Sequence, residues 1–194
     1  VEQVFAELAA LDRVGERAVG GRDDPDVDRP RLARAEHLVG AVLQHPEHTT
    51  ALCRDLAARF AGEDISVVIG PATGGIIVAY ETARALGVRG IFAERENGVM
   101  TLRRGFSIEP GERVLVVEDV ITTGGSVRET IAAVCSLGGN VVGAGLLVDR
   151  SGGTADLGVR QEALLVTETI TYDPAECPLC RAGITSVKPG SRSI

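Results

Sequence analysis

The stretch that decides the fold of this chain reads Val114-Leu-Val-Val-Glu118-Asp119-Val-Ile-Thr122-Thr123-Gly124-Gly125-Ser126. Its opening residues are apolar and mostly β-branched, which predicts a buried strand that ends at the two acids. The hydroxyl- and glycine-rich turn then leads into an amphipathic helix expected over residues 125–137. Backbone N–H groups of such a turn can converge on an anion, and the helix N-terminus adds partial positive charge. The stretch therefore predicts a phosphate site, beside acids that can accept hydrogen bonds from sugar hydroxyls.

Apolar runs and helical periodicity alternate on both sides of this stretch. Strands are expected over residues 65–69, 88–93, 141–148 and 163–166, the last at an edge of the sheet. A helix is expected over 76–86 and a polar loop over 94–107. Alternating strands and helices with short connections indicate right-handed βαβ crossovers. The predicted fold class is α/β, with one mainly parallel central sheet flanked by helices.

The N-terminal part of the chain reads differently. Helices are expected over residues 2–12, 32–43 and 49–60. Between the first two lies a charged, turn-rich segment, residues 15–31, with almost nothing to bury, which predicts an exposed loop. The predicted division is therefore N-terminal helices and a variant hood in 1–61, a core in 62–170, and a C-terminal tail in 171–194 that contributes to the hood or to a dimer.

Composition limits the classes of function. The chain has 194 residues and a formal charge of -7, with a pI near 5.0, so it lacks the overall positive charge that nucleic-acid binding requires. It contains no apolar run near the roughly 20 residues that span a bilayer, and no basic segment followed by a hydrophobic one at its start. We expect a soluble, cytoplasmic protein without nucleic-acid or membrane partners.

The chain contains 4 cysteines, at Cys53, Cys135, Cys177 and Cys180. The first two lie in helical patterns and are interpreted as small buried hydrophobic residues. Cys177 and Cys180 have the spacing of half a zinc site or of a redox pair. Their role is left open between a structural or incidental one and a metal or disulfide shared across a dimer.

A second glycine-rich loop follows the strand expected over 65–69 and reads Gly70-Pro-Ala-Thr-Gly-Gly75. It opens the helix expected over 76–86, so its N–H groups should also converge on an anion. Such turns are common and often serve only packing. Two of them at strand ends of one sheet suit a ligand with two separate phosphate groups. The triphosphate and dinucleotide motifs, Gly-x-x-x-x-Gly-Lys-Ser/Thr and Gly-x-Gly-x-x-Gly, are absent.

Several segments together resemble type I phosphoribosyltransferases, and most closely bacterial orotate phosphoribosyltransferases. The segments are 114–126, 70–75, 94–98, 100–106, 148–153, 177–180 and 187–192. The resemblance covers roughly residues 42–192. It implies the type I phosphoribosyltransferase fold with a small hood from the terminal segments. It also implies transfer of phosphoribosyl from phosphoribosyl pyrophosphate to orotate or a related acidic base, as in pyrimidine nucleotide biosynthesis.

The resemblance also implies roles for individual residues. Glu118 and Asp119 would hold the ribose hydroxyls. The 5′-phosphate would lie on Thr122, Thr123, Gly124, Gly125 and Ser126, and the pyrophosphate on Ala72, Thr73, Gly74 and Gly75. Arg150 would pair with the carboxylate of the base, which suits a planar guanidinium. The residues implied in catalysis are Asp119 and three arginines on or beside a mobile loop that reaches the partner subunit of a homodimer, Arg95, Arg103 and Arg104. Mg²⁺ would arrive chelated by the pyrophosphate, without metal ligands from the protein.

Two features depart from the family pattern. Val99 stands where the family commonly carries a lysine that neutralises the pyrophosphate, and Lys188 is the only lysine of the chain. Loss of one such cation costs on the order of 100-fold in rate. Residues 15–30 lack the hood segment, and no aromatic residue is present there to cover a pyrimidine. The base pocket could then accept another heterocycle, recruit its lid elsewhere or turn over poorly, and an error in the sequence of this stretch would look the same.

Two alternatives to an orotate enzyme follow from these departures. One is the same fold acting on another nucleobase-like acceptor in specialised nucleoside synthesis. The other is a sensor that binds phosphoribosyl pyrophosphate without catalysis. Arg95, Arg103, Arg104 and Arg150 at the matching positions favour an enzyme that recognises a carboxylate. The absence of an attached helix-turn-helix pattern or basic run argues against a DNA-binding regulator.

Overall fold

A 6-stranded sheet carries the fold, with its strands in the order β3-β2-β1-β4-β5-β6. The computed structural model describes residues 39, 40, 42–167 and 181. The strands are β1 (Val67–Pro71), β2 (Arg89–Glu96), β3 (Val99–Leu102), β4 (Arg113–Ile121), β5 (Asn140–Asp149) and β6 (Gln161–Val166). All neighbouring pairs are parallel except β2 and β3, which are antiparallel. The expected α/β class, with a mainly parallel sheet and an edge strand at β6, is confirmed.

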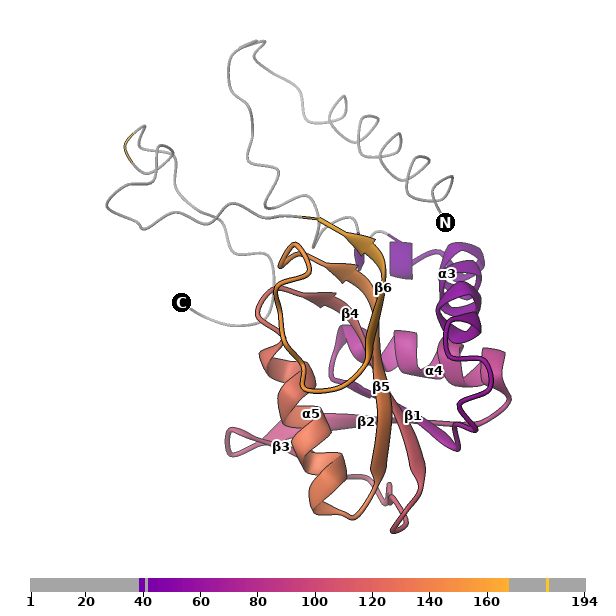
Figure 1. Cartoon of the computed structure of the whole chain (residues 1–194), viewed down its shortest axis with the longest axis vertical. Helices are drawn as coiled ribbons and strands as arrows, with labels where there is room; N and C mark the ends of the chain where they lie inside the picture. The colour runs from indigo at the N-terminus through magenta and orange to yellow at the C-terminus, as the bar shows by residue number, and fades with distance from the viewer. Residues whose placement is uncertain (1–38, 41, 168–180, 182–194) are drawn as a thin grey trace.

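Helices cover both faces of this sheet (Figure 1). They are α3 (Pro46–Ala58), α4 (Gly74–Leu86) and α5 (Gly125–Ser136). Successive side chains of β4 point to opposite faces. Leu115 and Val117 pack with residues of α3 and α4, whereas Val114 and Val116 pack with residues of α5. Both faces of β4 are therefore apolar, as expected for a central parallel strand.

The acids of β4 lie inside the strand and do not end it, so this part of the prediction is wrong. Pairing with β1 stops at Ile69↔Val116, but pairing with β5 continues to Ile121↔Asp149. The backbone ladder with β5 does not depend on the polarity of the side chains. Glu118 and Asp119 consequently lie on a rigid strand at the point where β1 has already separated from it.

The segment predicted as a polar loop, residues 94–107, begins with a β-hairpin. β2 runs on to Glu96 and pairs with β3 from Glu96↔Val99 to Ala93↔Leu102. Asn97 and Gly98 connect the strands with φ values of 51° and 84°. These positive φ values at an Asn-Gly pair are typical of a type I′ turn. Residues 95–99, around the turn, are exposed and mostly polar, so hydrophobic periodicity gave no signal for the end of β2 or for β3.

The remaining expectations divide into several groups. α3 begins earlier than predicted, with Pro46 in its first turn, a position that suits proline. Cys53 is buried as predicted, but Cys135 is exposed, because Val127, Thr130 and Val134 form the buried face of α5.

Other predictions concern residues that the structure does not describe: the helix over 2–12, the hood segment, Cys177 and Cys180. Within the described part of the chain, no helix is long and apolar enough to cross a membrane. The division into three parts stays a prediction.

Candidate active site

Both predicted anion-binding loops lie at the carboxyl ends of adjacent parallel strands, and each opens a helix. The first follows β1 and leads into α4, whose N-cap is Thr73. The second follows β4 and leads into α5, whose N-cap is Gly124. β1 and β4 are direct neighbours. Two helix N-termini, each with free N–H groups and a partial positive charge, thus face the same edge of the sheet.

The loop after β1 lies directly against the two acids of β4. A Cβ placed on Gly74 would lie 2.1 Å from Asp119 Oδ2, and one on Gly75 would lie 3.0 Å from Glu118 Oε1. A Cβ on Gly70 would lie 2.2 Å from the carbonyl oxygen of Gly75. Only glycine leaves room for these approaches. The structure therefore joins the first loop and the acid pair into one site, which the sequence pattern alone did not show.

Glu118 and Asp119 differ in their surroundings. Glu118 is 8% exposed, and its Oε1 accepts a hydrogen bond from the backbone N–H of Asp119 at 3.3 Å. Burial, together with the neighbouring charge of Asp119 and the hydrogen bond between their side chains, raises the pKa of the Glu118 carboxyl well above its usual range. Asp119 is half-buried, and its Oδ1 accepts from the backbone N–H of Val120 at 2.8 Å. The pair thus offers a carboxyl that holds a proton readily next to a more exposed carboxyl.

The loop after β4 is held from outside by the connection between β5 and β6. Gly124 has a φ of 73°, and a Cβ there would lie 2.5 Å from Cδ2 of Leu157. Arg128 Nη1 donates to the carbonyl oxygen of Asp156 at 3.0 Å. Thr122 and Thr123 are exposed. The loop is therefore fixed on its protein side and presents its hydroxyls outward, as an anion site requires.

Arg95 contacts the helix that the second loop opens. Its Nη1 lies 2.5 Å from Glu129 Oε2, an ion pair without the alignment of a hydrogen bond, and donates to Gly98 O at 3.3 Å. Glu129 lies one helical turn after Gly125 and Ser126 in α5. The guanidinium of Arg95 is thereby held on the α5 face of the sheet.

Arg103 and Arg104 follow β3 and turn back onto acids of β2. Arg104 Nη2 donates to Glu94 Oε2 at 3.1 Å, and its guanidinium lies 5.7 Å from the centre of the Phe92 ring. Arg103 Nη2 lies 3.3 Å from Glu96 Oε1. The structure places these two arginines on Glu94 and Glu96 and does not bring them to either loop. Their acidic partners were not singled out from the sequence.

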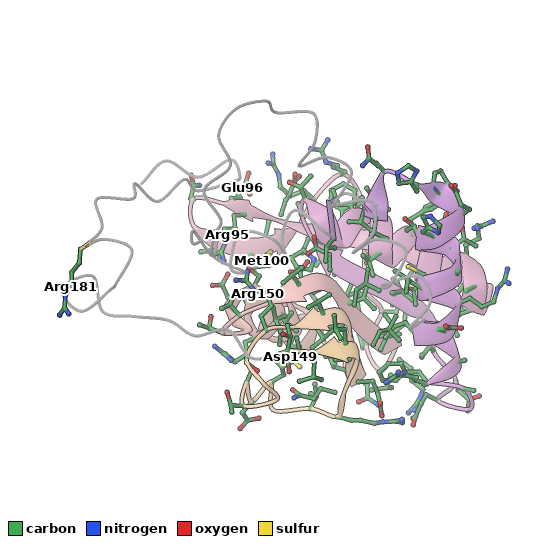
Figure 2. The ribbon with its side chains drawn as sticks, turned by 90° about the horizontal axis from the view of Figure 1, so that it is seen from above. Arg95, Glu96, Met100, Asp149, Arg150 and Arg181 are labelled. Atoms are coloured by element: carbon green, nitrogen blue, oxygen red, sulfur yellow. The ribbon has the colours of Figure 1, made fainter. Side chains whose placement is uncertain are left out.

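Arg150 lies immediately after β5 and is 6% exposed. Its backbone N–H donates to the carbonyl oxygen of Ile121 at 2.9 Å, one residue before the loop that begins at Thr122. Figure 2 shows Arg95, Met100 and Arg150 next to one another in that view. The neighbouring Asp149 is 1% exposed and was not singled out from the sequence, although a buried acid at the end of an apolar strand was a signal for it.

Comparison with known proteins shows the family to which the chain belongs. The family described as "Phosphoribosyl transferase domain" matches residues 39–158. The chain belongs to this family.

Curated relatives are similar over most of this phosphoribosyltransferase. The orotate phosphoribosyltransferase of Pelotomaculum thermopropionicum is 74% identical over 153 residues, which are 79% of this chain and 80% of the relative. That of Desulforamulus reducens is 65% identical over 153 residues, again 79% of this chain and 80% of the relative. The predicted resemblance to orotate phosphoribosyltransferases is confirmed.

Solved structures bear out the fold. An orotate phosphoribosyltransferase from Mycobacterium tuberculosis H37Rv, in complex with inorganic phosphate, is 30% identical with a TM-score of 0.54. The match covers 64% of this chain and 74% of that one. An adenine phosphoribosyltransferase from Rhodothermus marinus is 28% identical with a TM-score of 0.55, over 64% of this chain and 82% of that one. The type I phosphoribosyltransferase fold is thus confirmed.

Proposed function

We propose that this phosphoribosyltransferase transfers the 5-phosphoribosyl group of phosphoribosyl pyrophosphate to orotate or a related acidic base and releases pyrophosphate. The observation that carries the proposal is the approach of Gly74 and Gly75 to Asp119 and Glu118. It puts an acid pair between two helix N-termini. A ligand with a phosphate, a sugar diol and a pyrophosphate in that order matches this arrangement.

Support for the acceptor comes from the relatives and from one arginine. The relatives from Pelotomaculum thermopropionicum and Desulforamulus reducens both carry the name orotate phosphoribosyltransferase. In this chain Arg150 lies beside the loop after β4, where its guanidinium would pair with the carboxylate of the base. The reaction would serve pyrimidine nucleotide biosynthesis.

Each part of the site has a distinct task in this proposal. Thr122 to Ser126 hold the 5′-phosphate, and Ala72 to Gly75 hold the pyrophosphate through backbone N–H groups. Asp119 and Glu118 accept hydrogen bonds from the ribose hydroxyls. A buried carboxyl that keeps its proton can also donate a hydrogen bond. Glu118 can therefore either accept a hydrogen bond from a ribose hydroxyl or donate one to it.

Catalysis in this proposal is mostly positioning and charge stabilisation. A ring nitrogen of the base displaces pyrophosphate from C1 of the ribose through a transition state with oxocarbenium character. Negative charge grows on the leaving pyrophosphate, so cations aimed at it lower the barrier. Arg95, Arg103 and Arg104 are the residues that would supply this charge. Arg103 and Arg104 would have to exchange Glu94 and Glu96 for the pyrophosphate when the hairpin segment closes.

Three further features belong to the proposal. Mg²⁺ would be chelated mainly by pyrophosphate oxygens, where it neutralises charge. Few protein ligands are needed for an ion that is held in this way. The enzyme would work as a homodimer in the cytoplasm, with phosphoribosyl pyrophosphate and the base as its ligands.

The proposal is tested by pyrophosphate release. The protein is incubated with phosphoribosyl pyrophosphate, Mg²⁺ and, separately, orotate, uracil, adenine and hypoxanthine. We expect release with orotate and none above background with the neutral bases. Turnover of another base without turnover of orotate would replace the acceptor in the proposal. Tight binding of phosphoribosyl pyrophosphate with no turnover of any base would identify a sensor.

Another acceptor is the second candidate, favoured by one observation. Residues 15–30 lack the family hood segment that covers the base. The donor half of the site is unaffected by this difference. Adding other heterocyclic carboxylic acids to the panel of bases decides between the two candidate functions. In both, Arg150 would bind the carboxylate of the base, but the two bases differ in shape.

A further inference from the structure

The carboxyl end of β5 contains a buried acid that the proposed reaction does not use. Asp149 is 1% exposed, and its Oδ1 accepts hydrogen bonds from the backbone N–H and from the hydroxyl of Ser151, at 2.7 Å and 2.6 Å. A carboxylate in such a place needs charge-assisted partners to offset its desolvation. Asp149 therefore binds Ser151, the residue that follows Arg150, through two hydrogen bonds.

Ser151 also makes hydrogen bonds with the residues of the turn that follows it. Its Oγ donates to Asp149 and also accepts from the backbone N–H of Ala155 at 2.9 Å. Its carbonyl oxygen accepts from the hydroxyl of Thr154 at 2.7 Å. The hydroxyl proton and one lone pair of Ser151 are thus both engaged. A single hydroxyl links the buried acid to residues 151–155.

The backbone of Arg150 is fixed from three directions as a result. On the β4 side, its N–H donates to Ile121 O at 2.9 Å. On the β6 side, the N–H of Thr167 donates to Asp149 O at 2.8 Å. From the C-terminal side, the Asp149 carboxylate holds the N–H of Ser151, which belongs to the peptide that leaves Arg150. Both backbone dihedrals of Arg150, which is labelled in Figure 2, are thereby constrained, and this fixes the direction of its Cα–Cβ bond.

We propose that Asp149 and Ser151 are positioning residues that set the direction of Arg150 and so control recognition of the acceptor. This inference rests on the proposed function, in which Arg150 pairs with the carboxylate of the base. Bidentate pairing of guanidinium with carboxylate requires two parallel hydrogen bonds, so a rotation of the Arg150 backbone weakens both. Loss of the contacts between Asp149 and Ser151 frees the peptide that follows Arg150, whereas the hydrogen bond from Arg150 N to Ile121 O, which adjoins the donor loop after β4, is kept.

The test compares variants of the hydroxyl in steady-state kinetics with orotate and phosphoribosyl pyrophosphate. Ser151→Ala removes a hydrogen bond to a charged group, and we expect the KM for orotate to rise on the order of 10-fold or more. The KM for phosphoribosyl pyrophosphate should stay within about twofold, since the donor loops keep their contacts. Ser151→Thr keeps the hydroxyl and should restore the KM for orotate.

The matched control is Thr154→Val, which removes a hydroxyl from the same turn without touching Asp149. It should leave both KM values unchanged. If Ser151→Ala does not fold, Asp149→Asn carries the same test, because it keeps the volume of the side chain and removes the charge of the acceptor.

Three results would overturn the inference: an unchanged KM for orotate, an equal rise of both KM values, or equal effects of Ser151→Ala and Thr154→Val. A wild-type protein that turns over no orotate would defeat the proposed function and the inference with it. A wild-type protein that uses orotate, with variants that show no split between the two KM values, would defeat the inference alone.

Discussion

The substitution Gly74→Ala tests the joined site most directly. The added Cβ would lie 2.1 Å from Oδ2 and 2.6 Å from Cγ of Asp119. Contacts below 3.0 Å are essentially never seen for real Cβ atoms, so something must move by about 1 Å. The short side chain of Asp119 can rotate, whereas Gly74 begins α4 and is held by the helix. We therefore expect Asp119 to leave its position and the fold to survive.

The cost of this movement falls on catalysis. A misplacement of about 1 Å at a reacting centre costs on the order of 100-fold in rate. That factor corresponds to about 2.7 kcal/mol of transition-state stabilisation. Stability should change little, because the hydrogen bond from Val120 N to Asp119 Oδ1 contributes only about 1 kcal/mol and alanine favours the helix. For a chain of this length, that loss lowers Tm by roughly 2–4 °C at most.

The assay measures kcat/KM for phosphoribosyl pyrophosphate together with the thermal unfolding midpoint. Gly40→Ala is the matched control, because Gly40 lies in a helical segment with nothing within 4 Å of an added Cβ. It should leave kcat/KM unchanged. If Gly74→Ala keeps the kcat/KM of the wild type, Asp119 does not depend on this glycine for its position, and the reasoning fails.

The remaining predictions concern the other parts of the site and the core. The pKa of Glu118 is raised in the folded state, whereas in the unfolded chain it is roughly 4.3. The stabilisation that protonated Glu118 gives the folded state is therefore complete below the pKa of the unfolded chain and decreases as the pH rises above it. Glu118→Gln cannot ionise, so the Tm of this variant minus that of the wild type should increase from pH 4 to pH 8. A Tm difference that does not change with pH would contradict the raised pKa. Val99 is 66% exposed, so Val99→Lys should fold normally and raise kcat without a large change in donor affinity; a lower kcat would mean that the site is built around valine. Burial raises the pKa of the Cys53 thiol to about 11, so iodoacetamide at pH 8 should modify Cys135 and leave Cys53 intact in peptide mapping of the native protein.

The central unit of the fold could be predicted because its signals are local. An apolar β-branched run, a glycine-rich turn and an amphipathic helix occur in one continuous stretch, and β4, its loop and α5 follow that order. The first part of β2 was predicted by the strand expected over 88–93, but the end of β2 and the whole of β3 were missed because residues 95–99 are exposed and give no periodic signal. The Asn97-Gly98 pair was the one available signal, and it matches the turn that forms there.

The site was predicted in parts, and its assembly was not. Each loop could be located from glycines after a strand. That Gly74 lies against Asp119 depends on the register of β1 with β4, which no local pattern encodes. Arg95 and Glu129 lie far apart in the sequence, and their pairing is likewise a result of α5 packing over the sheet.

The hydrogen bond from Arg150 N to Ile121 O means that, in the proposed function, the donor half and the acceptor half of the site would share one hydrogen bond of the sheet. Thr122, which begins the loop proposed to bind the 5′-phosphate, follows Ile121 directly. The distance between a bound phosphate and a bound carboxylate would thereby be set by the pairing of β4 with β5. A shift of Arg150 along the sheet would then also move Ile121 or break this hydrogen bond. In the proposed function, a new acceptor would therefore have to be accommodated without a change in the register of β4 with β5.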